Sequence, residues 1–235
     1  MHTLGKISKR SFLKSALGLG GIGMAAKALE GFGSPREAYA QLLESGIEEK
    51  SVLARVKKEG VLKVGYAQTL PWVHKDPKTN SLAGIYYDVV EAMAKELEVK
   101  VEYSEVSWAN STVGLRKGDY DLFGSSLFYT VPRALVVNYT APLWHKGHLA
   151  LTHKDNAKRF KSIADFNRPD VTFSINVGTR EEHVLKVMFP KAKIITTSGQ
   201  IVLSAEPVRT KKADLWVSGD LDVMLFAKKN SSWAH

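Results

Sequence analysis

A long stretch near the middle of the chain alternates between strand-like and helix-like patterns. Residues 61–67 (VLKVGYA) and 100–106 (KVEYSEV) are rich in β-branched and aromatic residues, as strands are. Between them, residues 86–99 carry apolar side chains at positions 89, 90, 93, 94 and 97, which is the spacing of one helix face. A short helix over 110–119 and a strand over 120–126 continue the alternation. This pattern favours a parallel sheet wrapped by helices.

The alternation restarts in the second half of the chain. Strands are expected over 148–154, 171–177, 193–197 and 213–218, with helical stretches over 180–189 and 199–211. We therefore expect an α/β protein with two lobes, each a parallel-rich sheet with flanking helices. The first lobe is predicted to span 51–147, beginning with a short helix over 51–59, and the second to span 148–235.

Turn-forming and helix-capping residues add detail to the first lobe. Pro71, Pro77, Asn80 and Gly84 predict a loop over 71–84. Asp88 is a candidate N-cap for the helix that follows, because a short carboxylate can accept a bond from the first free backbone N–H groups.

The first forty residues have the layout of an export signal. A basic start that includes Lys9 and Arg10 precedes an apolar run rich in glycine and alanine, and Ala38-Tyr39-Ala40 forms a small-x-small cleavage site. Residues 8–14 resemble the twin-arginine signal, with Lys9 in place of the first arginine. The alternatives are an amphipathic helix or an uncleaved anchor, although the run is shorter than the about 20 residues of a spanning helix. We expect residues 1–40 to be removed and the mature chain to be soluble and periplasmic.

The composition excludes several kinds of site. The chain has no cysteine, which rules out disulfides, thiolate metal sites and a cysteine nucleophile. Its net charge of +9 is scattered among acids, which favours a solvated positive surface over nucleic-acid binding. His145, His148 and His153 are close in sequence but have no supporting carboxylate pair, so we interpret them as ordinary histidines. We expect no metal, no cofactor and no nucleic-acid partner.

Polar and aromatic residues follow three of the expected strands. In open parallel sheets, ligands bind outside the carboxyl ends of the strands. The residues at these ends are Trp72 after the first strand, Ser125, Ser126, Thr130 and Arg133 after the third, and Gly178, Thr179 and Arg180 after a strand of the second lobe. Two such edges facing each other would form a cleft that suits a small ligand.

The order of these motifs resembles the periplasmic solute-binding proteins of the polar amino-acid type. The pieces that carry the resemblance are EGVLKVGYA (59–67), LRKGDYDL (115–122), SSLFYTVPR (125–133), YTAPL (139–143) and VGTREEH (177–183). The resemblance implies a type II periplasmic-binding fold whose two lobes close on an amino acid. It also implies a monomeric receptor that delivers its ligand to the membrane permease of an ATP-driven importer.

The resemblance assigns roles in the first lobe. Arg133 would bind the ligand's α-carboxylate, since a guanidinium offers paired donors that match a carboxylate. A capping arginine at the surface is the alternative. Ser125 and Ser126 would add hydroxyl and backbone donors. Phe128 stands where many members carry a small polar residue, so it predicts an apolar floor, or else a core side chain.

In the second lobe, Thr179 begins a helix whose backbone N–H groups attract an anion. Arg180 stands where the family often has a hydroxyl. Either the ligand's carboxylate gains a second guanidinium, or the ligand carries an extra negative charge. The alternative is that Arg180 points to solvent. Trp72 would stack on the ligand or pack against the lobe. Asp220 is the nearer match to the acid that binds the α-amino group, with Asp222 as the other candidate and an N-cap as the alternative.

The resemblance also implies a returning strand and a C-terminal helix, for which we find no residues after FAKKNSSWAH (226–235). We therefore expect an incomplete second lobe and looser closure. The predicted function is ligand capture without catalysis. A cyclohexadienyl (prephenate or arogenate) dehydratase on the same fold is the alternative, and it would need a general acid or base in the cleft. A ligand-sensing domain is a third reading.

Overall fold

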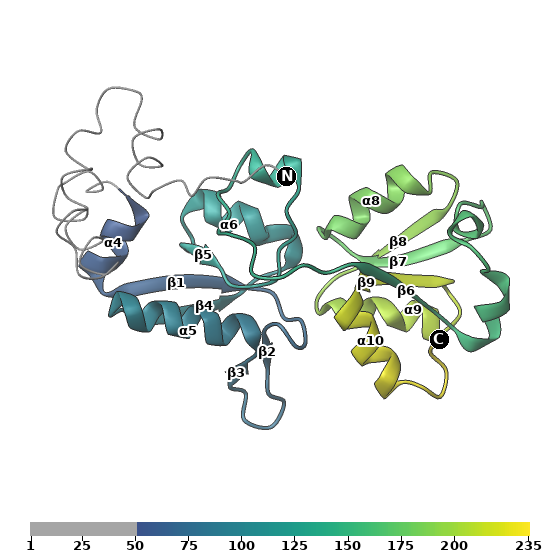
Figure 1. Ribbon diagram of the computed structural model, residues 1–235, viewed down its shortest axis with the longest axis horizontal. Coiled ribbons are helices and arrows are strands. Elements are labelled where there is room, and N and C mark those ends of the chain that lie inside the picture. The colour runs from purple at the N-terminus through teal and green to yellow at the C-terminus, as the bar shows by residue number, and fades with distance from the viewer. Residues whose placement is uncertain (1–50) are drawn as a thin grey trace, which may run out of the picture. The chain divides into compact units, whose positions relative to one another are not determined.

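The computed structural model describes residues 51–235, which contain two larger sheets and one two-stranded hairpin (Figure 1). The export signal predicted over 1–40 lies outside the described residues. Helix α4 (Val52–Glu59) belongs to a first unit, residues 1–59, and the chain from Gly60 onward forms a second. Residues 51–59, which we placed in the first lobe, thus fall in the first unit. Both lobes discussed below lie within 60–235.

The first lobe is built on a three-stranded parallel sheet with the order β4–β1–β5. The central strand β1 (Val61–Tyr66) pairs in parallel with β4 (Lys100–Glu105) and β5 (Leu122–Phe123). Parallel neighbours need a crossover connection, and α5 (Ile85–Leu97) and α6 (Ser111–Lys117) lie in the two connections. The predicted alternation of strand and helix is therefore confirmed.

Two details of the first lobe differ from expectation. The N-cap of α5 is Gly84, and Asp88 lies in the first turn of the helix, so the predicted aspartate cap is wrong. Gly84 has φ 127°, and a Cβ there would lie 2.5 Å from the carbonyl oxygen of Trp72, so only glycine fits. The expected loop over 71–84 contains a hairpin of β2 (His74–Lys75) and β3 (Leu82–Ala83).

The second lobe is built on a four-stranded sheet with the order β6–β9–β7–β8. Strand β7 (Thr172–Asn176) is parallel to β8 (Lys193–Thr197) and to β9 (Leu215–Gly219). Strand β6 (His148–Thr152) pairs with β9 in the antiparallel direction. All four predicted strands are present, and the sheet is parallel apart from its β6 edge.

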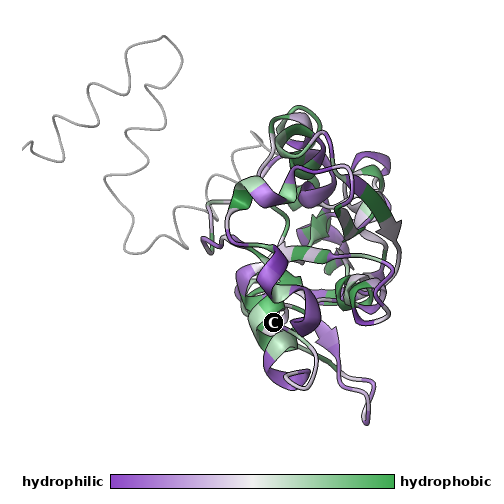
Figure 2. Ribbon diagram, turned by 90° about the vertical axis from the view of Figure 1, so that its right-hand side faces the viewer, coloured by the Kyte–Doolittle hydropathy of each residue, from purple (hydrophilic) through white to green (hydrophobic). Residues whose placement is uncertain are grey.

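Both faces of the second sheet are covered by helices (Figure 1). One core contains Phe173, Ile175 and Leu185, with Leu185 contributed by α8 (Arg180–Met188). The opposite core contains Leu151, Val208, Trp216 and Val223, with contributions from α9 (Glu206–Arg209) and α10 (Asp220–Lys229). Since successive strand residues point to opposite faces, β9 serves both cores. The helices accordingly carry apolar and polar residues on different sides (Figure 2).

Short helices complete the chain. The expected helical stretch over 199–211 is a 3₁₀ helix η4 (Ile201–Ala205) followed by α9, whose first turn contains proline. The 3₁₀ helices η1 (Trp108–Asn110), η2 (Lys154–Arg159) and η3 (Ile163–Phe166) and the one-turn helix α7 (Val131–Ala134) were not anticipated as separate elements.

Within 60–235 the chain passes from the first sheet to the second between Leu135 and Gly147. Near its end, Ala234 forms an isolated bridge with His153, beside β6. None of the helices in the part of the chain that the structure describes is long and apolar enough to cross a membrane. The incompleteness of the second lobe stays a prediction.

Candidate functional site

Residues that follow β5, β7 and β9 line one small cavity of about 20 Å³. Its polar and charged lining residues are Ser126, Arg133, Lys146, Thr179, Arg180, Glu181 and Asp222. The first lobe and the second both contribute to this set, as the resemblance implied. The cavity is large enough for one water molecule but too small for an amino acid, because side chains of both lobes fill this part of the site.

Arg133 bridges the two lobes. It lies in α7, where Thr130 is the N-cap and accepts a bond from the Arg133 backbone N–H at 3.4 Å. Its guanidinium donates to the carbonyl oxygen of Phe128 at 3.2 Å and to that of Gly178, in the second lobe, at 2.8 Å. Burial lowers the pKa of Arg133 from its usual value, and nearby Tyr139 and Glu181 oppose this shift. An arginine has five N–H donors, and those that do not bond to Phe128, Gly178 or Tyr139 remain for a bound carboxylate.

Phe128 lies among cationic and aromatic groups of the second lobe. Its ring stacks on His148 with 4.8 Å between centroids, and the guanidinium carbon of Arg180 lies 5.2 Å from its centroid. Arg180 therefore covers the Phe128 ring, with Nη1 3.4 Å from His148 Nδ1. The sequence left open whether this arginine points to solvent, and the structure places it against the site.

Glu181 is the buried acid behind this group. Its Oε1 lies 2.9 Å from His148 Nε2, and its side chain is 4% exposed. Burial by itself raises the pKa of Glu181, but the contact with His148 and a backbone N–H outweigh it and hold the pKa below the usual glutamate value. His148 is thus an internal partner of a carboxylate, consistent with an ordinary histidine.

A second buried acid, Asp222, faces the first lobe. It accepts bonds from the indole Nε1 of Trp72 at 2.8 Å and from Ser218 at 3.2 Å. Lys146 Nζ lies 3.5 Å from Asp222 Oδ2 and 3.4 Å from the hydroxyl of Ser126. Burial raises the pKa of Asp222, although Lys146 and the Trp72 hydrogen bond oppose that shift.

Three other predicted residues form hydrogen bonds with backbone groups of the protein. The hydroxyl of Ser125 donates to the backbone carbonyl of Ala67 at 3.1 Å and accepts from its N–H at 3.0 Å, so it ties β1 to the chain after β5. Thr179 donates to Asn176 O at 2.8 Å. Asp220 accepts from the backbone N–H of Gly147 at 3.0 Å and does not line the cavity. Of the two candidate acids, Asp222 rather than Asp220 lies at the site.

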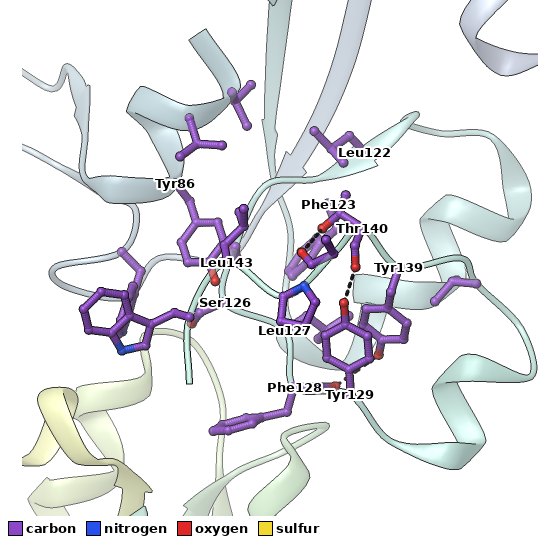
Figure 3. Close-up of a pocket in the computed structure, with 18 of the residues that line it drawn as sticks. Tyr86, Leu122, Phe123, Ser126, Leu127, Phe128, Tyr129, Tyr139, Thr140 and Leu143 are labelled. Atoms are coloured by element: carbon purple, nitrogen blue, oxygen red, sulfur yellow. Dashed lines mark hydrogen bonds between the residues drawn. The ribbon is translucent and has the colours of Figure 1, made fainter. Parts of the chain in front are cut away.

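A larger cavity of about 560 Å³ adjoins the site on the side of the first lobe. Its lining is mostly apolar and aromatic and includes Tyr86, Leu122, Phe123, Tyr139 and Leu143 (Figure 3). Trp72, Ser125, Ser126, Phe128, Lys146 and Arg180 also border it. Phe128 lies at one end of this cavity, apart from Phe123 and Thr140 (Figure 3). The large apolar cavity and the small charged cavity are therefore lined in part by the same residues.

Comparison with known families identifies this arrangement. Residues 62–234 match the model of the bacterial extracellular solute-binding proteins, family 3. The chain belongs to this family. The match covers both lobes, so the resemblance inferred from scattered motifs extends to the whole of the described α/β fold.

Individual relatives of this family-3 chain include binding proteins and an enzyme. The crystal structure of an ancestral amino acid-binding protein, a precursor of cyclohexadienyl dehydratase, is 33% identical, with 77% of this chain and 79% of that chain covered and a TM-score of 0.72. Cyclohexadienyl dehydratase of Pseudomonas aeruginosa is 22% identical over 75% of this chain and 66% of the relative. The L-cystine-binding protein TcyA of Bacillus subtilis is 28% identical over 61% of this chain and 52% of the relative. The chain therefore spans about half to two thirds of these curated relatives.

Sequence reasoning missed Lys146 and placed Asp222 second among its two candidate acids. Lys146 stands alone in LWHKGH, a stretch with no motif that marks it as a site residue. Asp222 was named as a candidate, but Asp220 was judged the nearer match to the family pattern. Helix geometry offered a useful signal for Asp222. Side chains two residues apart on a helix point in directions that differ by about 200°, so only one of the two acids can face the site.

Proposed function

We propose that this chain is the extracytoplasmic substrate-binding component of an ATP-driven importer, which captures an amino acid or a similar small carboxylate-bearing solute. The observation that carries the proposal is the convergence of Arg133 and Arg180, from different lobes, on one cavity that Ser126 and Thr179 also line. Guanidinium groups match carboxylates in shape and charge. Names of relatives, such as the L-cystine-binding protein, support an amino acid as the ligand class.

Capture requires the lobes to separate and close again. The small cavity that Arg133 and Arg180 both line has no room for a solute, and the Arg133–Gly178 and Trp72–Asp222 hydrogen bonds join the lobes. A ligand would enter an open form and replace part of these contacts with its own, as in other hinged binding proteins. The permease partner, the monomeric state and export through residues 1–40 rest on the family pattern and belong to the same proposal.

Thermal melting of residues 41–235 tests this function. A panel of amino acids, small dicarboxylates and prephenate would be screened, because a ligand that binds only the folded state raises the melting temperature. We expect at least one carboxylate to raise it, and Arg133→Ala to abolish the increase. Arg116→Ala, an exposed arginine in α6, is the matched control and should keep it. An increase that survives Arg133→Ala would refute the assigned role of Arg133, and no increase with any compound would refute the ligand class.

A dehydratase is the second candidate. Two relatives are a cyclohexadienyl dehydratase and an ancestral precursor of one. Such a reaction needs a general acid, and Asp222 is the buried acid whose pKa is raised. Prephenate would then be consumed with formation of an aromatic product, which absorbs in the ultraviolet. Turnover that is lost in Asp222→Asn would support the enzyme, whereas binding of prephenate without turnover would support the receptor.

A further inference from the structure

The ammonium of Lys146 occupies a complete cation-binding pocket. Its Nζ lies 4.9 Å from the centroid of the Trp72 ring and 5.0 Å from that of Phe128. Asp222 supplies a carboxylate oxygen at 3.5 Å and Ser126 a hydroxyl at 3.4 Å. Aromatic faces together with a buried carboxylate are what a protein offers to an ammonium group. The occupant here is a side chain of the protein itself.

We propose that Lys146 determines the ligand class: by filling the ammonium pocket, it makes this chain a receptor for carboxylates that carry no α-ammonium group, in preference to amino acids. The inference rests on the proposed function and narrows it. Arg133 and Arg180 remain available for the carboxylate, while the pocket formed by Trp72, Phe128 and Asp222 is already taken.

The lysine is built into the pocket. Its side chain is 9% exposed and that of Asp222 is 1% exposed. Gly219, the last residue of β9, makes room for the pair: a Cβ there would lie 2.7 Å from Lys146 Nζ and 2.8 Å from Asp222 Oδ2. Lys146 is also tethered next to β6, where the backbone of Gly147 is bonded to Asp220 in both directions. A tethered group competes at an effective concentration on the order of millimolar or higher, so a free ammonium must displace it.

The charge balance of the site points the same way. Among the described residues, its charged lining groups are the cations Arg133, Lys146 and Arg180 and the acids Glu181 and Asp222. The cations of this set outnumber the acids by one. A zwitterionic amino acid adds no net charge, whereas a carboxylate without an ammonium neutralises the excess. In a site of low polarity the second arrangement is favoured.

Matched pairs of ligands test the proposal. Each pair contains an L-amino acid without a charged side chain and the acid in which hydrogen replaces the ammonium: leucine and 4-methylpentanoate, phenylalanine and 3-phenylpropionate, alanine and propionate. Calorimetry on residues 41–235 gives the ratio of the two dissociation constants within a pair. We expect the deaminated acid to bind about tenfold or more tightly than its amino acid in every pair that binds.

Lys146→Met keeps the length and apolar stem of the side chain but vacates the ammonium. The ratio should then shift toward the amino acid by about tenfold or more, because Asp222 needs a new cation. Lys146→Arg retains a charge at this position and should keep the wild-type preference. Lys95→Met changes an exposed lysine of α5 and should leave the ratio unchanged.

The outcomes separate this inference from the proposed function. If the wild-type protein binds amino acids as tightly as their deaminated partners, or if Lys146→Met leaves the ratio unchanged, the role of Lys146 is refuted while the receptor function stands. If neither the wild-type protein nor Lys146→Met binds any of these six compounds or any member of the melting panel, the proposed function fails and the inference fails with it. Should Lys146→Met not fold, the wild-type ratio still decides, because a wild-type protein with no preference for the deaminated acids refutes the role of Lys146.

Discussion

At the scale of single residues, two acids two positions apart have different surroundings. Asp220 accepts a hydrogen bond from the backbone N–H of Gly147, while Asp222 is buried against Trp72 and Lys146. The helix that begins after β9 turns one side chain toward the other lobe and the other toward the connecting segment. Residue type therefore identified both Asp220 and Asp222 as candidate acids. Their positions on the helix decided which of the two reaches the site.

Glu181 yields a prediction for the pH dependence of stability. Its pKa is lower in the folded protein than is usual, so it contributes stability above the ordinary carboxylate range near pH 4, which is lost as the pH falls through the lowered folded value. Glu181→Gln removes the charge next to His148. We expect it to reduce the free energy of unfolding at neutral pH by about 1–3 kcal/mol and to flatten the fall in stability below pH 5.

Urea titrations at several pH values would measure both effects. Glu96→Gln is the matched control, because Glu96 is exposed on α5 and its replacement should change neither the free energy nor its pH profile. A Glu181→Gln protein whose stability falls with acid in parallel with the wild type would contradict the assignment of this carboxylate as the one that loses its partner.

At the scale of elements, the start of α8 depends on a glycine that meets the other lobe. Gly178 precedes the N-cap Thr179 and has φ 78°, and a Cβ there would collide with the backbone of Ala109 in η1. The same residue offers its carbonyl to Arg133. The close approach of η1 to the end of β7 thus requires a residue without a side chain.

Gly178→Ala and Gly118→Ala form a matched pair. Gly118, which ends α6, has φ 75°, and a Cβ added there would meet nothing within 4 Å, so its replacement measures the backbone cost alone. That cost is about 1–2 kcal/mol for an L-residue in the left-handed region. We expect Gly178→Ala to lower the free energy of unfolding by about 1–3 kcal/mol more than Gly118→Ala, because of the collision with Ala109. Equal losses in urea titrations would show that the two lobes do not meet tightly there.

The strands show which parts of the fold sequence patterns could predict. The strands over 61–67, 100–106 and 193–197 were predicted within about a residue, because runs rich in β-branched and aromatic residues are local signals. The strand expected over 120–126 is reduced to Leu122–Phe123, since the chain beyond it bonds through the Ser125 side chain to Ala67. A side-chain bond across 58 residues leaves no local pattern.

At the scale of the whole 60–235 unit, a mixed apolar cluster and a few polar bonds hold the lobes together. The cluster packs Ala67 and Trp108 of the first lobe against Ile201 of the second. The Trp72–Asp222 and Arg133–Gly178 hydrogen bonds also join the lobes. A ligand that enters the site must offset the loss of such contacts, so their number tunes affinity.

Trp72→Phe is predicted to favour the open form without unfolding either lobe. The change removes the indole donor to Asp222, and a hydrogen bond to a charged group contributes about 1.5–3 kcal/mol. Small-angle scattering should then show a larger radius of gyration without ligand, with an unchanged far-ultraviolet circular dichroism spectrum. Trp233→Phe is the control, because this ring packs on His153 and Phe226 within the second lobe and its replacement should leave the scattering unchanged. A compact Trp72→Phe protein would indicate that the apolar cluster and the Arg133–Gly178 bond are enough to keep the lobes together.

Local patterns along the chain were enough to predict the α/β class, the family and the arginine-containing end of the candidate site, because hydrophobic period, strand composition and short motifs are properties of neighbouring residues. The other end of the candidate site became visible only in the folded chain. Lys146, Trp72 and Asp222 meet from positions up to 150 residues apart, and no local pattern records that a lysine ammonium lies between two aromatic rings and a buried carboxylate. The burial and the charge pairing of these residues arise from that long-range meeting, which requires the chain to be folded.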